Sequence, residues 1–64
     1  MMSPAETYLL AEAQEIIGMA KSLQTHGQDA EAMEFVWAAA LRLQAIRALQ
    51  DMRQAAEDCD RAAH

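Results

Sequence analysis

Residues that bend, stop or cross-link a chain are scarce in this sequence. Its 64 residues include two glycines, one proline and one cysteine, and the aromatic residues are only Tyr8, Phe35 and Trp37. Because Cys59 has no second cysteine to pair with, an internal disulfide framework is excluded and a reducing, cytoplasmic setting is expected. Helix-favouring residues dominate and β-branched residues are few, so the composition predicts an all-α protein.

Long hydrophobic runs are missing as well. No stretch approaches the roughly 20 consecutive apolar residues that a transmembrane helix needs. The N-terminus has no basic segment followed by an apolar run, which is the pattern of a secretory signal. We therefore expect neither a membrane span nor a secretory signal.

The chain is also too short to build a large core. At 7.1 kDa it forms a single domain, residues 1–64, and the apolar surface that it can bury roughly offsets the entropy lost on folding. Little net stability is left for the chain alone. A partner is therefore expected, most simply a second copy that makes a homodimer.

Positive charge is scarce too. Five Lys and Arg residues face ten Asp and Glu residues, which gives a net charge of −5. Residues 1–34 hold six of the acids against Lys21 alone, whereas residues 35–64 hold four arginines and four acids. Nucleic-acid binding needs a basic stripe that replaces counterions on phosphates. A nucleic-acid partner or an anionic membrane surface is therefore not expected.

The arginines of the C-terminal half have two possible roles. Arg42 and Arg53 fall on nearly the same helix face, so a small basic patch stays open as support for nucleic-acid regulation. The alternative is local pairing on a solvated face. At a spacing of four residues, the expected pairs are Arg47 with Asp51, Arg53 with Glu57, and Glu57 with Arg61.

A first helix is predicted over about residues 4–25. Ser3-Pro4-Ala5-Glu6 is a capping box, in which the Ser3 hydroxyl accepts from the Glu6 amide and the Glu6 carboxylate accepts from the Ser3 amide. Apolar residues then follow at spacings of three and four, and Glu6 lies off this stripe. The stripe consists of Leu9, Ala13, Ile16, Ala20 and Leu23.

The two glycines have different expected roles. Gly27 lies in a predicted turn over residues 26–29, where it suits the left-handed residue that ends a helix, and Asp29 can cap the next helix. Gly18 lies inside the first helix, where it either costs about 1 kcal/mol or marks a close helix approach. The short connection predicts that the two helices are antiparallel neighbours.

The second helix is predicted over about residues 30–61 and is longer than the first. It contains neither glycine nor proline, is apolar almost all round in its middle, and then carries a stripe that no helix of the same chain can cover. This stripe consists of Ala45, Leu49, Met52, Ala56 and Cys59. We therefore expect the hairpin to dimerise into a four-helix bundle or to dock on another protein.

The stretch from Ala13 to Ala39 carries the spacing of one tetratricopeptide (TPR) repeat. The matching positions are Ile16, Met19, Ala20, Leu23, Gly27, Ala32, Val36 and Ala39. The sequence resembles that family here, which implies a helical hairpin that binds protein. It departs from the family because Val36 replaces an aromatic residue. It also has a single copy, whereas such repeats normally need about three.

A second resemblance is one of size and layout. The hairpin and its G-x-D-A turn at Gly27 are similar to the small helical co-chaperones of type III secretion systems. This likeness implies a chaperone-like bacterial protein that pairs with a repeat protein, and small bacterial or phage regulators share the same build.

No residue pattern predicts an enzyme, a cofactor or a metal site, since serines lack a nearby base and acids lack further ligands. The predicted function is that of a regulator, adaptor or co-chaperone that covers an apolar surface of a protein partner. A purely structural oligomerisation module is the alternative. The candidate partner-binding or dimer-interface residues are Phe35, Trp37, Leu41, Ala45, Leu49, Met52, Ala56 and Cys59.

Overall fold

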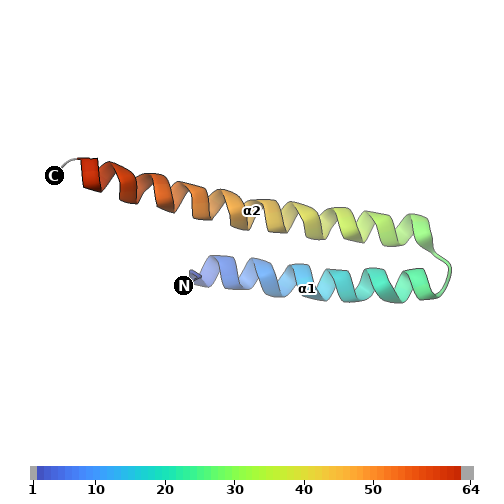
Figure 1. Cartoon of the computed structure of the whole chain (residues 1–64). Helices are drawn as coiled ribbons and strands as arrows, with labels where there is room; N and C mark the ends of the chain where they lie inside the picture. Colours follow the sequence, from blue (N-terminus) through green and yellow to red (C-terminus); the bar gives the residue numbers. More distant parts are fainter. Residues whose placement is uncertain (1, 63–64) are drawn as a thin grey trace.

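The computed structural model describes residues 2–62, which form two antiparallel helices lying side by side (Figure 1). Helix α1 spans Pro4–Thr25 and helix α2 spans Asp29–Ala62, with no strand among the described residues. The predicted fold class, an all-α hairpin with a longer second helix, is confirmed. Because α2 has 34 residues and α1 has 22, the last turns of α2 extend beyond α1 (Figure 1).

The start of α1 follows one half of the predicted capping box. The Glu6 amide donates to Ser3 Oγ at 3.2 Å, and Pro4 is the first helical residue. The other half differs, because the Glu6 carboxylate accepts from the Ser3 hydroxyl at 3.1 Å and reaches toward α2. The cap therefore also aims the Glu6 side chain at the second helix.

The turn ends α1 by a Schellman motif. Gly27 has a φ of 78°, its amide donates to the Gln24 carbonyl at 3.0 Å, and the Gln28 amide donates to the Leu23 carbonyl at 2.9 Å. The Ala32 amide donates to the Gln28 carbonyl at 3.0 Å, so α2 begins at Asp29. Asp29 is thus the first residue of α2 and not the residue before it.

The two glycines are expected to respond in opposite ways to alanine. A Cβ at Gly18 would meet nothing within 4 Å, so this glycine does not mark a close helix approach. Gly18→Ala should stabilise the hairpin by about 0.5–1 kcal/mol through helix propensity. Gly27→Ala should destabilise it by about 1–2 kcal/mol because of its positive φ. Urea unfolding followed by circular dichroism measures both, and shifts of the same sign would contradict this assignment.

The buried apolar residues form one seam of mostly small side chains. They recur at seven-residue steps, and they are Ala13 and Ala20 of α1 and Ala32, Ala39 and Ile46 of α2. The contacts of Arg42 with Glu12 and of Gln50 with Glu6 show that α1 and α2 run antiparallel on either side of this seam. Alanine at these positions lets the helices approach closely. It also means that few large side chains are removed from water within the hairpin.

Candidate protein-binding surface

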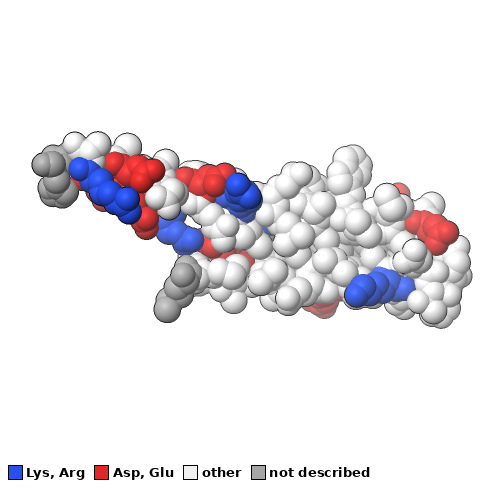
Figure 2. Space-filling model, viewed as in Figure 1, with Lys and Arg blue, Asp and Glu red and all other residues white. Residues whose placement is uncertain are grey.

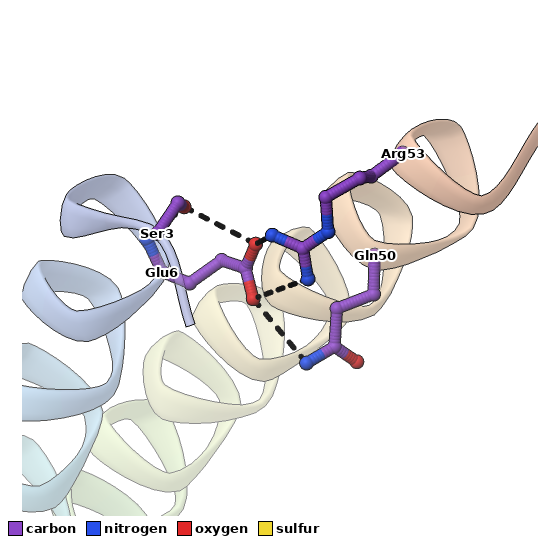
Figure 3. A network of polar contacts seen from close by, with 4 residues as sticks. All are labelled: Ser3, Glu6, Gln50 and Arg53. Atoms are coloured by element: carbon purple, nitrogen blue, oxygen red, sulfur yellow. Dashed lines mark hydrogen bonds and ion pairs between the residues drawn. The ribbon is translucent and has the colours of Figure 1, made fainter. Parts of the chain in front are cut away.

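A polar cluster closes the open end of the hairpin, and we call Ser3, Glu6, Gln50 and Arg53 the clasp (Figure 3). The Glu6 side chain is only 2% exposed. Arg53 donates from Nη1 to Glu6 Oε1 at 2.6 Å and from Nη2 to Oε2 at 3.4 Å, and Gln50 donates to Oε2 at 3.3 Å. Every buried polar side-chain atom among the described residues has a partner. The clasp therefore holds a buried charge without leaving it unpaired.

The clasp corrects two expectations from the sequence. Glu6 was expected off the helix stripe, but it lies one heptad before Ala13 on the seam and is buried. Arg53 was expected to pair with Glu57, but it lies one heptad after Ile46 and pairs with Glu6 instead. The seven-residue spacing from Ala13 back to Glu6 and from Ile46 on to Arg53 indicates that both residues lie on the seam. A search for apolar residues alone misses this spacing, because both end positions are polar.

The environment of Glu6 shifts its pKa. Burial raises the pKa of the carboxyl, but hydrogen bonds from Arg53, Ser3 and Gln50 and the charge of Arg53 lower it by more. The net result is a pKa below the ordinary 4.5. Because the fold favours the ionised form, Glu6 contributes stability at neutral pH, and that contribution is lost as the pH falls through the folded-state pKa.

The remaining arginines are also engaged by carboxylates or carbonyls. Arg42 Nε lies 3.4 Å from Glu12 Oε1 across the helices, and its Nη1 donates to the Ala38 carbonyl at 3.0 Å. The expected pair of Arg47 with Asp51 is confirmed at 3.3 Å. Arg61 lies 4.0 Å from Asp58, not beside Glu57. Arg42 and Arg53 thus each pair with an acid of α1, and the small basic patch that the sequence leaves open stays a prediction.

The apolar side chains of α2 are divided between the hairpin interface and solvent. Trp37, Leu41 and Met52 are 72%, 56% and 68% exposed. We define the outer face of α2 as the exposed residues among the candidates from the sequence, which are Trp37, Leu41, Ala45, Met52, Ala56 and Cys59. Phe35 and Leu49 do not belong to it, because both are half-buried. Six of the eight candidates are thus available to a partner.

Two shallow grooves flank the seam at the turn end of the hairpin. One has a volume of about 300 Å³ and runs between Ile17 of α1 and Ala32, Met33 and Val36 of α2. The other, of about 390 Å³, lies between Met19 and Leu23 of α1 and Phe35 of α2. Phe35 therefore lines a groove, whereas Trp37 is the exposed aromatic residue of α2.

Charged side chains are unevenly distributed over the molecule (Figure 2). Figure 2 shows acidic and basic side chains gathered over the end of α2 that extends past α1, while the middle of the hairpin is mostly white in this view. Within residues 2–62, no group of three or more His, Cys, Asp or Glu side chains is placed to hold a metal ion. No described helix is long and apolar enough to cross a membrane. The exposed apolar face of α2 is therefore the feature of this surface that most needs an explanation.

Comparison with known proteins identified no match: no family model, curated protein or solved structure is similar enough to this chain to be counted. The resemblances to a TPR repeat and to secretion co-chaperones therefore stay predictions from the sequence.

Proposed function

We propose that this protein is a small adaptor or regulator that binds another protein through the outer face of α2. The observation that carries the proposal is the exposure of Trp37, Leu41 and Met52, which are 72%, 56% and 68% exposed along one helix. Contiguous exposed apolar residues of this kind mark protein interaction sites. Tryptophan is also enriched among the residues that dominate binding energy, so Trp37 is the proposed anchor.

The proposed mechanism is steric. A partner helix packs along the outer face, where the small side chains of Ala45 and Ala56 let the two backbones approach and Leu41 and Met52 fill the spaces beside them. The clasp keeps α1 on the opposite side of α2, so the outer face stays available. Binding covers an apolar surface of the partner, which is how a cytoplasmic, chaperone-like adaptor or regulator of bacterial or phage type would act.

A purely structural oligomerisation module is the second candidate, because it would use the same face. The difference lies in whether a second, different protein occupies it. Chemical catalysis is not proposed, since the clasp engages its own polar groups in holding the hairpin together.

The test is recovery of cross-linked partners from the native host with the full chain. Leu41→Asp combined with Met52→Asp should reduce recovery of a stoichiometric partner by about 30-fold or more, as expected for loss of a residue worth about 2 kcal/mol. Tyr8→Asp is the matched control, because Tyr8 is an exposed apolar residue of α1. Equal recovery with all three chains would sink the proposal.

A further inference from the structure

α2 carries a second coiled-coil pattern that α1 does not use. Eight apolar positions follow one another at spacings of three and four residues, and none of them is buried. They are Ala38, Leu41, Ala45, Ala48, Met52, Ala55, Cys59 and Ala62, and we call them the outer seam. Sustained spacing of this kind is the sequence pattern by which one helix packs along another. The outer seam therefore has the length and composition of a helix-packing surface.

The outer seam lies on a different side of α2 from the surface that packs against α1. On the side of α2 that faces α1, the seven-residue series continues from Ile46 to Arg53 and then to Asp60, and Gln50 and Glu57 lie beside it. These polar residues either join the clasp or lie exposed. The end of α2 that extends past α1 is thus polar on its α1 side and apolar on its outer side.

The elongated chain as a whole exposes more surface than a compact protein of its mass. The chain exposes 5074 Å², whereas a compact protein of its 7.1 kDa mass exposes about 4,100 Å². The difference of roughly 1,000 Å² is close to the ~800 Å² per partner that a stable interface of ordinary size buries. Residues 38–62 run for about 37 Å, which gives a contact of suitable length.

We propose that the outer seam binds a second copy of this chain in an antiparallel orientation. This inference rests on the proposed function in that it uses the same exposed face of α2, and it names a second copy of the chain as an occupant of that face. In the register that pairs all eight positions, every large side chain meets a small one. The layers are Ala38 with Ala62, Leu41 with Cys59, Ala45 with Ala55, and Ala48 with Met52 of the second copy. When large side chains pair with small ones, the distance between the two helices stays nearly constant along the contact.

The parallel orientation lacks this complementarity. It would place Leu41 against Leu41 and Met52 against Met52. These large pairs would hold the two helices apart, so the alanines of the layers between them could not come into contact. It would also bring together the acidic start of both α2 helices, where Asp29, Glu31 and Glu34 stand without a basic residue. Like charges at close range oppose association. Antiparallel packing keeps these acidic ends apart.

The antiparallel register has one adverse contact. Its twofold axis passes near residue 50, so Asp51 approaches Asp51 of the second copy at the edge of the seam. Arg47 Nε lies 3.3 Å from Asp51 Oδ1 in the same chain, which reduces the repulsion. The contact is at the exposed edge, where screening by solvent and salt is strong.

Cysteine cross-linking tests the orientation, because the chain has one native thiol that is exposed. In the antiparallel register, Cys59 faces Leu41 of the second copy and lies about 27 Å from the other Cys59. A disulfide needs Cα atoms closer than about 7 Å. Leu41→Cys with Cys59 retained should therefore oxidise to a covalent dimer. The wild type and Leu41→Cys combined with Cys59→Ser should stay uncross-linked.

Tyr8→Cys with Cys59 retained is the control, since it adds an exposed thiol on α1. Rapid cross-linking of the wild type through Cys59 would overturn the antiparallel orientation. Cross-linking of Leu41→Cys no faster than that of Tyr8→Cys would overturn the pairing itself. Two further outcomes separate this inference from the proposed function. If the wild type keeps the mass of one chain while recovery of a different protein still requires Leu41 and Met52, the inference fails and the proposed function stands. If instead the wild type forms the dimer, but the combined Leu41→Asp and Met52→Asp variant recovers other proteins as well as the wild type does, the adaptor function fails.

Discussion

Replacing Ala39 with leucine is expected to destabilise the hairpin by about 1–3 kcal/mol. Ala39 is 2% exposed at the middle of the seam, where α1 packs against α2. A leucine here has no space unless the helices move apart, which would weaken every seam contact. Because a chain of this size has little net stability, a change of this magnitude should remove much of the folded population.

The measurement is urea unfolding followed by circular dichroism at one protein concentration. Ala30→Leu is the matched control, because Ala30 lies on α2 and is exposed. It should leave the unfolding midpoint nearly unchanged. If Ala39→Leu and Ala30→Leu unfold at the same urea concentration, the helices do not pack as closely as the buried alanines indicate.

The second large effect concerns the clasp and depends on pH. The folded-state pKa of Glu6 lies below its ordinary 4.5, so the unfolded chain binds its proton first as the pH falls. Glu6 therefore contributes stability above about pH 4.5, and that contribution disappears as the pH drops through the folded-state pKa. Glu6→Gln should melt at a clearly lower temperature than the wild type at pH 7. The difference should shrink toward zero in acid, where the protonated Glu6 resembles glutamine.

Thermal melts of both chains between pH 7 and pH 3 measure this difference. Glu15→Gln is the control, because Glu15 is an exposed acid of α1 with no role in the clasp. It should differ little from the wild type at any pH. A gap between the wild type and Glu6→Gln that stays constant across the whole range would show that the ionised carboxylate is not what stabilises the open end.

Much of the fold follows from local sequence. The capping box at Ser3 begins α1, the positive φ of Gly27 ends it, and the following stretch lacks any residue that stops a helix. These features act over a few residues, so they can be recognised without knowing the tertiary structure. The antiparallel hairpin then follows from the short turn.

The clasp could not be predicted in the same way. Apolar periodicity identifies the seam, but Glu6 and Arg53 are the polar ends of that seam, and each also has a plausible partner on its own helix. Their pairing depends on the register of α1 against α2. That register is a property of the packed hairpin and not of either helix alone.

The candidate surface was predicted in part for a related reason. The middle of α2 is apolar almost all round, so the sequence does not say which side α1 covers. Ala48 and Leu49 are neighbours in the sequence and lie on different sides of the helix. Ala48 is exposed and Leu49 is half-buried, but the stripe predicted from the sequence contains Leu49. The large exposed residues Trp37, Leu41 and Met52 were nevertheless among those predicted.

The central structural claim is that the outer seam of α2 binds a second copy of this chain. Light scattering after size exclusion, repeated over a series of concentrations beside circular dichroism melts, tests it most directly. We expect the mass of the wild type to rise from 7.1 kDa toward twice that value, with a melting temperature that rises in parallel. The combined Leu41→Asp and Met52→Asp variant should stay at the mass of one chain. A fully helical wild type of 7.1 kDa at every concentration, with a melting temperature that does not change, would contradict the claim.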